Sequence, residues 1–362
     1  MSLPFDVRPH AQPVPAAERA GRMADPGFGR VFTDHMAVIR WSEAAGWHDA
    51  HVAARAPLQM DPASSVLHYA QEIFEGMKAY RLADGGTALF RPTANARRFR
   101  DSARRMAMPE LPEELFVESV ERLVAIDRDW IPAVGVEGSL YLRPFQIASE
   151  VFLGVKPSTE YLFMVIASTV GAYWKGGARA ISTWVSPDYT RAAPGGTGAA
   201  KCGGNYAASL LAQKEALAKG CDQVVFLDAV ERRWVEELGG MNVFFVFADG
   251  SIATPPLTGT ILPGITRDSI LTIARDRGLV VREERYAIDQ WRADATGGRL
   301  VEAFACGTAA VVTTIGEVVE PAGRFTIGDG RAGPVTTALG DALVAIQRGA
   351  APDPHGWLHR LA

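Results

Sequence analysis

The sequence predicts an α/β protein of the α+β kind with two domains, and three observations support this prediction. The chain has 362 residues, which is long enough for two domains of ordinary size. Segments with strand-like alternation and segments with helix-like periodicity follow one another along most of it. Between them, residues 171–177 mix glycine, lysine and aromatic residues, a composition typical of a linker. We expect a small N-terminal domain over 1–170, a linker over 171–179 and a larger C-terminal domain over 180–362.

The N-terminal domain is expected to begin with an irregular arm over 1–30. Asp84-Gly85-Gly86 is a hairpin turn signal between two strands. The expected strands are 31–41, 78–81, 139–147 and 161–168, and the expected helices are 65–76, 94–106 and 112–129.

The C-terminal domain is expected to alternate short strands with helices. Gly220 suits the end of one helix. Thr266 can cap the start of another, and Asp268 lies in the first turn of that helix. The expected strands are 180–185, 223–227, 233–238, 243–247, 280–286, 302–305 and 309–314, and the expected helices are 207–219, 266–277 and 335–348.

Composition and charge exclude several classes of protein. The formal net charge is −4 and no long basic run occurs, so nucleic acid and anionic membranes are poor candidates for partners. No apolar stretch reaches the length of a transmembrane helix. The three cysteines form no CxxC pair, which favours a reducing, cytoplasmic environment, and no metal-ligand spacing occurs.

Lys201 is the most informative residue of the chain. It is one of six lysines and lies between two glycine-rich turns, in the segment from Pro194 to Tyr206. A partly desolvated lysine can lose its proton and attack a carbonyl, whereas arginine cannot form an imine. The simpler interpretation is a solvated loop residue. A phosphate-binding loop is excluded because Ala200 and Cys202 flank the lysine, where that loop needs Gly and Ser or Thr.

Glu236 and Glu237 are predicted to point to opposite faces of a strand, one outward and one inward. An inward carboxylate needs a cationic or protonated partner, and a protonated pyridine nitrogen would serve. The alternative is two ordinary surface glutamates.

A phosphate site is predicted from three weaker features. Gly264-Ile-Thr-Arg-Asp268 opens a helix whose first N–H groups and Thr hydroxyl could bind an anion, although a plain capped helix is the commoner case. Cys306-Gly-Thr-Ala-Ala310 offers another hydroxyl and exposed amides. Arg98 is one of several arginines on a helix, most of which are expected to be solvated. Together with Lys201 and the inward glutamate, these features match what pyridoxal phosphate requires of a protein.

The chain resembles a known family, the branched-chain amino-acid aminotransferases, which are fold-type IV pyridoxal-phosphate enzymes. The resemblance runs from about Phe28 to near the C-terminus. It rests on the blocks 28–36, 68–79, Tyr141-Leu-Arg-Pro144, 195–206, 237–242, Thr254-Pro-Pro-Leu257 and 261–267. The resemblance implies a C-terminal domain with a mixed, β-barrel-like sheet and a homodimer with active sites at the subunit interface.

The resemblance also assigns roles residue by residue. Lys201 would carry pyridoxal 5'-phosphate as a Schiff base and move the proton between Cα and C4′. Glu237 would pair with the pyridine nitrogen, and Tyr206 would bond the phenolate oxygen. The phosphate would be held by Arg98, Ile265, Thr266 and Thr308.

For the substrate, the resemblance implies that Ala309 binds the carboxylate through its amide and that Arg143 accepts the second carboxylate of glutamate. The side-chain pocket would contain Phe28, Phe74, Tyr141 and Tyr206, with Tyr69, Leu153 and Val155 coming from the partner subunit. Ordinary core packing is the alternative for these residues. Gly240 stands where some members of the family have threonine, so a hydroxyl contact near the substrate is missing. Ala310 and Thr313 occupy the positions of a redox CxxC pair, so no such switch is expected.

The predicted activity is that of a branched-chain transaminase. It would move the amino group of L-leucine, L-isoleucine or L-valine to 2-oxoglutarate by a ping-pong mechanism, giving branched-chain 2-oxo acids and L-glutamate. One alternative keeps the fold but changes the reaction to that of a D-amino-acid aminotransferase or an aminodeoxychorismate lyase. Another is a non-catalytic binding protein.

Overall fold

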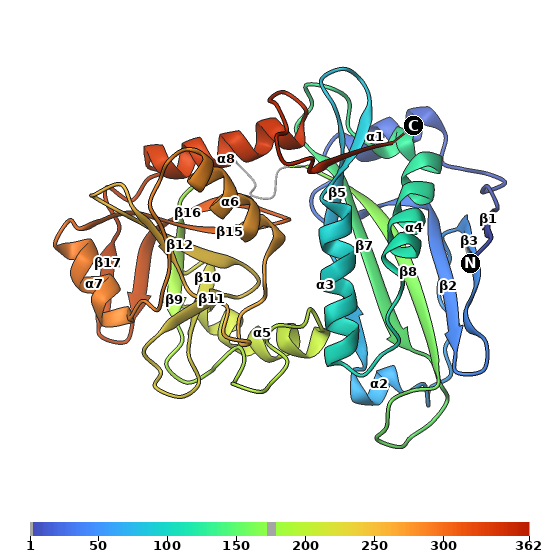
Figure 1. Cartoon of the computed structure of the whole chain (residues 1–362), viewed down its shortest axis with the longest axis horizontal. Coiled ribbons are helices and arrows are strands. Elements are labelled where there is room, and N and C mark those ends of the chain that lie inside the picture. The colour runs from blue at the N-terminus through green and yellow to red at the C-terminus, as the bar shows by residue number, and fades with distance from the viewer. Residues whose placement is uncertain (1–2, 172–178, 362) are drawn as a thin grey trace. The chain divides into compact units, whose positions relative to one another are not determined.

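The computed structural model describes residues 3–171 and 179–361, which form two compact units (Figure 1). Among the described residues, the first unit contains 3–171, 200–203 and 346–361, and the second contains 179–199 and 204–345. Most of the expected linker therefore lies outside the described residues. The units differ from the expected division in two segments, 200–203 and 346–361, which both belong to the first unit.

The first unit is built on a nine-stranded sheet with the order β1-β3-β2-β8-β7-β5-β6-β18, while β4 pairs with β7. All its strand pairs are antiparallel except β1 with β3. The strands are β1 (Phe5–Val7), β2 (Val31–Ser42), β3 (Gly46–Ala54), β4 (Glu72–Phe74), β5 (Met77–Arg81), β6 (Thr87–Phe90), β7 (Ser139–Ala148), β8 (Glu160–Val170) and β18 (Leu358–Leu361).

Two helices, α3 and α4, cover this sheet and close its core. Phe99 of α3 and Phe116 of α4 pack against each other and against Phe163 of β8, with ring centroids 5.3–5.9 Å apart. Such aromatic packing removes a large apolar area from water and is a main source of stability. The helices of this unit are α1 (Ala16–Met23), α2 (Val66–Tyr69), α3 (Pro92–Arg105), α4 (Glu113–Ile126) and the 3₁₀ turn η1 (Arg128–Trp130).

The second unit contains another nine-stranded sheet, with the order β11-β10-β9-β16-β15-β12-β13-β14 and β17 paired to β16. This sheet is mixed, because β9 is parallel to both β10 and β16 while β12, β15 and β16 are antiparallel neighbours. Its strands are β9 (Ile181–Val185), β10 (Gln223–Leu227), β11 (Val235–Leu238), β12 (Asn242–Phe247), β13 (Ile252–Thr254), β14 (Val281–Glu283), β15 (Leu300–Gly307), β16 (Val311–Glu320) and β17 (Gly323–Thr326). Its helices are α5 (Gly203–Ala218), α6 (Ile265–Asp276), α7 (Ile288–Thr296) and α8 (Pro334–Gln347).

Several expected elements differ from those in the structure. The helix expected over 65–76 is only the single turn α2, because Ala70 adopts a left-handed conformation and the following residues pair with β7 as β4. The arm expected to be irregular contains β1 and α1, and α7 was not expected. The last strand, β18, pairs with β6, so long-range pairing places the C-terminal segment in the first unit.

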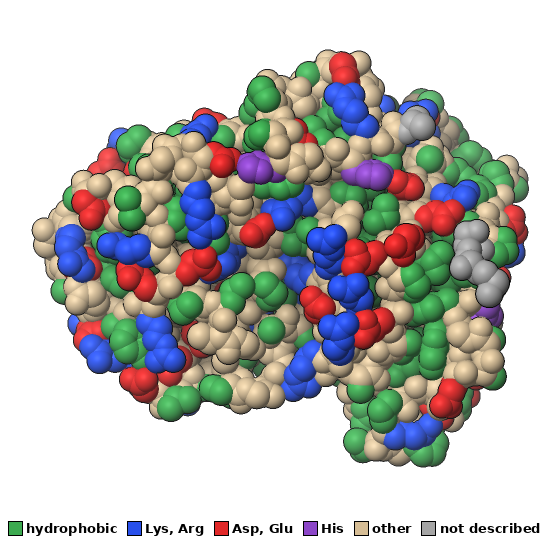
Figure 2. Space-filling model, in the orientation of Figure 1, with side chains coloured by type: hydrophobic (Ala, Val, Ile, Leu, Met, Phe, Trp, Pro, Cys, Tyr) green, Lys and Arg blue, Asp and Glu red, His purple; other side chains and the backbone are tan. Residues whose placement is uncertain are grey.

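The surface carries no extended area of one charge on the face that Figure 2 shows, where acidic and basic side chains are interspersed. This agrees with the net charge of −4. Within residues 3–171 and 179–361, no helix is both long and apolar enough to cross a membrane.

Candidate active site

Hydrogen bonds of its backbone groups hold the segment that carries Lys201 in the first unit. The Lys201 N–H donates to Ser102 Oγ on α3 at 3.0 Å, and its carbonyl accepts from the Phe74 N–H of β4 at 3.0 Å. Two residues further, the Gly203 N–H donates to the Glu72 carboxylate. Ala200 and Cys202 are buried in the core of the first unit. The backbone on either side of Lys201 is therefore fixed, and only its side chain can move.

The Lys201 side chain lies in surroundings that favour the neutral amine. Its Nζ is 4.8 Å from the centre of the Phe74 ring. Burial, and after it the charge of Arg98, lowers the pKa of Lys201 to about 8, while the charge of Glu75 opposes the shift. At a pKa of about 8, roughly a tenth of the amine is neutral at pH 7, whereas an ordinary lysine is almost wholly protonated. Lys201 is thus prepared to act as a nucleophile and a base.

Arg98 is the buried arginine of α3. Its Nε and Nη2 each donate to one oxygen of Glu75, both at 2.7 Å, and Glu75 is completely buried. A bidentate pair of this kind fixes the guanidinium plane. Glu75 was missed by the sequence analysis, although an acid inside the apolar run Ile73–Met77 was a usable signal.

Four of the residues predicted to line the substrate pocket lie together in the first unit. The rings of Phe28 and Tyr141 are 5.0 Å apart, edge to face. The Arg143 guanidinium lies 4.9 Å from the Phe74 ring centre and 5.4 Å from that of Tyr141, and it donates to the Tyr141 hydroxyl at 3.1 Å. The cluster thus combines three aromatic rings with one cation, the Arg143 guanidinium.

Tyr69, Leu153 and Val155 lie on the surface of the first unit, with 38%, 62% and 88% of their surface exposed. The Tyr69 hydroxyl donates to the Leu153 carbonyl at 2.6 Å, which joins α2 to the loop between β7 and β8. Figure 2 shows hydrophobic side chains at the end of the unit where Figure 1 places α2.

In the second unit, β11 places Glu237 in a buried position. Its Oε2 lies 3.0 Å from Arg191 Nη1 and accepts from the Leu262 N–H at 3.1 Å, and Oε1 accepts from Asn242 Nδ2 at 3.5 Å. The expectation that one of Glu236 and Glu237 faces solvent is wrong. Glu236 is also buried, because both faces of β11 are covered, and it accepts from the Thr260 hydroxyl at 2.5 Å.

Tyr206 and Gly240 are neighbours in the second unit. Tyr206 lies in the first turn of α5, and Gly240 lies in the tight turn between β11 and β12. A Cβ at position 240 would lie 3.5 Å from Tyr206 Cε1, an ordinary contact distance. A Cβ at this position would therefore be accommodated without moving Tyr206.

The predicted phosphate-binding residues of the second unit lie on a helix start and a hairpin. Ile265 and Thr266 are the first residues of α6. The expectation that Thr266 caps this helix is wrong, since Gly264 is the N-cap and no side chain caps it. A Cβ on Gly264 would lie 2.0 Å from Asn242 Oδ1, so close packing requires glycine there. Thr308 and Ala309 form the loop between β15 and β16.

Each unit by itself holds groups whose chemistry suits part of pyridoxal phosphate. The first unit supplies an amine with a lowered pKa and a fixed guanidinium. The second supplies a buried carboxylate, a phenol, a helix start without a side-chain cap, and a hydroxyl-bearing loop. A helix start and a guanidinium suit a phosphate, and a buried carboxylate suits a protonated ring nitrogen.

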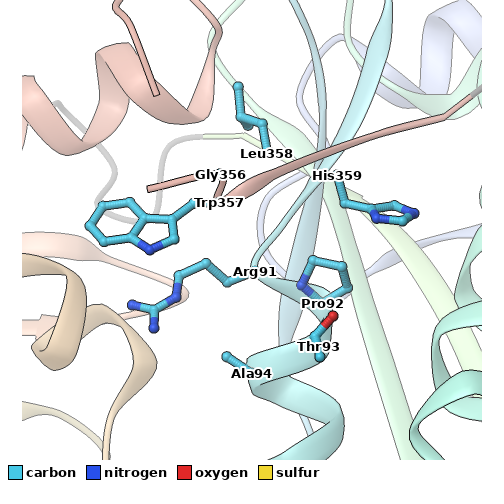
Figure 3. A pocket seen from close by; sticks show the side chains of 8 residues that line it. All are labelled: Arg91, Pro92, Thr93, Ala94, Gly356, Trp357, Leu358 and His359. Carbon is cyan, nitrogen blue, oxygen red and sulfur yellow. The ribbon is translucent and has the colours of Figure 1, made fainter. Parts of the chain in front are cut away.

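A separate cavity lies in the first unit at the start of α3 (Figure 3). It has a volume of about 200 Å³ and is lined by Arg91, Pro92, Thr93, Ala94, Gly356, Trp357, Leu358 and His359. None of the predicted site residues lines it.

Comparison with known proteins gives consistent results. The family model described as amino-transferase class IV matches residues 72–318. The chain is 58% identical over 358 residues, 99% of each chain, to a probable branched-chain-amino-acid aminotransferase of Streptomyces coelicolor. It is 56% identical to the branched-chain-amino-acid aminotransferase of Mycolicibacterium smegmatis, covering 99% of this chain and 98% of the relative.

Solved structures agree with these relatives. The branched-chain amino acid aminotransferase of Escherichia coli has a TM-score of 0.73 and 30% identity, covering 89% of this chain and 98% of its own. That of Thermobaculum terrenum, solved in its PLP form, has a TM-score of 0.69 and 26% identity, covering 90% of this chain and 98% of its own. The fold is thus that of a pyridoxal-phosphate enzyme, and the chain belongs to the branched-chain aminotransferases of the class IV aminotransferase family.

Proposed function

We propose that the enzyme transfers the amino group of L-leucine, L-isoleucine or L-valine to 2-oxoglutarate, giving the branched-chain 2-oxo acid and L-glutamate. The cluster of Phe28, Phe74 and Tyr141 around Arg143 is the observation that supports these substrates. Its rings suit a branched aliphatic side chain. Its one cation suits the second carboxylate of glutamate, so a single pocket can serve both amino donors.

Pyridoxal phosphate, when bound, supplies a carbonyl that accepts the amino group and a ring that delocalises the electron pair left at Cα. Lys201 would hold the cofactor through its neutral amine. The same amine would accept the proton that leaves the substrate Cα and give it back later in the reaction, and the second half-reaction would use the same groups in the opposite direction. A pKa near 8 suits this proton exchange, because the amine can both accept and give a proton near neutral pH.

The remaining residues would bind and orient the cofactor and the substrate. Glu237 would accept a hydrogen bond from the protonated ring nitrogen, and Tyr206 would donate one to the phenolate oxygen. Arg98, Ile265, Thr266 and Thr308 would hold the phosphate. The amide of Ala309, together with the backbone of Gly240, would bind the substrate carboxylate.

We further propose a homodimer in which the partner subunit's Tyr69, Leu153 and Val155 complete the apolar pocket. The exposure of these side chains supports this, since exposed apolar clusters mark interaction surfaces. A cytoplasmic location is supported by the three cysteines, which are all buried and unpaired by disulfides.

A steady-state panel of L- and D-amino acids with 2-oxoglutarate as acceptor tests this function. Turnover of L-leucine, L-isoleucine and L-valine well above that of other L-amino acids and of D-amino acids is expected. A preference for D-amino acids, formation of 4-aminobenzoate from aminodeoxychorismate, or no turnover with added cofactor would contradict it.

A further inference from the structure

The ion pair between Arg191 and Glu237 is a deeply buried pair of charges at the predicted site. Arg191 Nη1 lies 3.0 Å from Glu237 Oε2, and each side chain is only 2% exposed. The same nitrogen donates to the Thr260 carbonyl at 2.7 Å and to the Gly198 carbonyl at 3.2 Å. The guanidinium is therefore held by two carbonyl acceptors and by the ion pair with Glu237, which come from three separate segments.

The backbones that carry the two carbonyl acceptors, at Gly198 and Thr260, lie unusually close together. A Cβ at Gly198 would lie 2.4 Å from the Thr260 carbonyl oxygen, so only glycine allows the two backbones to approach this closely. Gly198 belongs to the glycine-rich turn that precedes Lys201 in the chain. One function of that turn is thus to enclose the Arg191 guanidinium beside Glu237.

The positive charge of Arg191 favours the charged form of the Glu237 carboxylate. A carboxylate without a cationic partner in a dry interior takes up a proton rather than remain charged. Arg191 therefore keeps Glu237 anionic. The Leu262 N–H, which donates to the same oxygen, acts in the same direction.

We infer that Arg191 is a positioning residue that decides which side of the hydrogen bond between Glu237 and the cofactor ring nitrogen holds the proton. This inference rests on the proposed role of Glu237. With Arg191 present, Glu237 stays anionic and the proton stays on the nitrogen. Without that charge, the proton moves from the nitrogen to a Glu237 oxygen, both groups become neutral, and the ring withdraws electrons less strongly.

A purely structural role for Arg191 makes a different prediction. In that case Arg191 serves only to connect the segments around Gly198 and Thr260 by hydrogen bonds to their carbonyls. A neutral residue that still donates hydrogen bonds would then leave the ring nitrogen protonated. Loss of these hydrogen bonds would weaken the binding of pyridoxal phosphate and of an analogue without the ring nitrogen equally.

The experiment uses Arg191→Gln, Arg191→Lys and, as a second neutral variant, Arg191→Met. Arg292→Met is the control, because Arg292 also pairs with a buried glutamate of the same unit, Glu320, at 2.7 Å. The main measurement is the ¹⁵N chemical shift of bound pyridoxal phosphate labelled at the ring nitrogen. The second is the dissociation constant of pyridoxal phosphate and of its 1-deaza analogue, in which carbon replaces that nitrogen.

The wild type, Arg191→Lys and Arg292→Met are expected to show a protonated ring nitrogen, and both neutral variants a deprotonated one. The neutral variants should bind pyridoxal phosphate on the order of tenfold more weakly, as expected for one lost buried charge interaction, while their affinity for the deaza analogue changes much less. A protonated nitrogen in Arg191→Gln, or equal losses for the two cofactors, would overturn the inference. So would failure of both neutral variants to fold, judged by circular dichroism, since Arg191 would then be needed for folding alone.

Glu237→Gln separates this inference from the proposed function. If that variant keeps a protonated ring nitrogen and wild-type turnover, the proposed role of Glu237 is wrong. If it loses both while Arg191→Gln keeps both, Glu237 acts as proposed and only the role of Arg191 fails.

Discussion

At the scale of single residues, two lysines have similarly shifted pKa values but different surroundings. Burial lowers the pKa of both Lys78 and Lys201 to about 8. Lys78 lies within β5, whose neighbours on both sides are strands, whereas Lys201 lies in the short segment before α5 beside Phe74, Arg98 and Arg143. A shifted pKa alone therefore does not distinguish the two lysines, and it is the neighbouring groups that favour Lys201 as the proposed nucleophile.

Lys201→Ala is expected to abolish covalent attachment of the cofactor and to lower turnover by about 10⁴-fold or more, because both the nucleophile and the base are lost. Attachment is measured by borohydride reduction and mass spectrometry, and turnover with L-leucine. Lys214→Ala, at an exposed lysine of α5, is the control. Substantial residual turnover would move the assignment to Lys78.

The pH dependence of cofactor attachment follows from the pKa of Lys201. Only the neutral amine attacks, so below a pKa of about 8 the rate should rise tenfold per pH unit and level off above it. An unshifted lysine would still be rising at about pH 10. Stopped-flow absorbance of the cofactor-free enzyme mixed with pyridoxal phosphate distinguishes the two profiles.

At the scale of elements, the segment 200–203 shows how a loop acquires a fixed place. It belongs by contacts to the first unit, although its neighbours on both sides in the chain belong to the second. Its polar contacts come from β4 and α3, through Glu72, Phe74 and Ser102. The flanking glycines are explained in part by this packing, since a Cβ at Gly203 would lie 2.2 Å from the Glu72 carboxylate.

Ser102→Ala is expected to destabilise the enzyme by about 1–3 kcal/mol, because the Lys201 N–H loses its acceptor in a buried place. It should also slow cofactor attachment, since the Lys201 backbone is less firmly held. Ser119→Ala is the matched control, because Ser119 is equally buried but its hydroxyl donates only to the Leu115 carbonyl of its own helix. Thermal unfolding and attachment rate are measured. Equal behaviour of the two variants would contradict a specific role for Ser102.

At the scale of the whole molecule, the sequence predicted the order of most strands and helices, but not their long-range pairing. The strand that carries Glu237 followed from local alternation, whereas β4, which contacts Lys201, was expected to be part of a helix. By contrast, β18 pairs with β6 from the opposite end of the chain, and Glu236 is buried by packing on the second face of its strand; neither depends on local pattern. Likewise, Arg98 could be singled out among the arginines of α3 only through resemblance, since its distinguishing partner, Glu75, comes from a different part of the chain.

Assembly is the remaining property of the whole molecule, and the exposed cluster of Tyr69, Leu153 and Val155 makes it testable. Val155→Asp should weaken the dimer without affecting the fold of the single chain, because Val155 is 88% exposed there. Activity should fall together with dimerisation and recover at high protein concentration, since the partner's Val155 would complete the pocket. Val230→Asp, at a residue that is 75% exposed in the second unit, is the matched control and should remain dimeric and active. Sedimentation velocity and turnover measured over a range of concentrations decide the matter: a fully dimeric, fully active Val155→Asp would place the interface elsewhere.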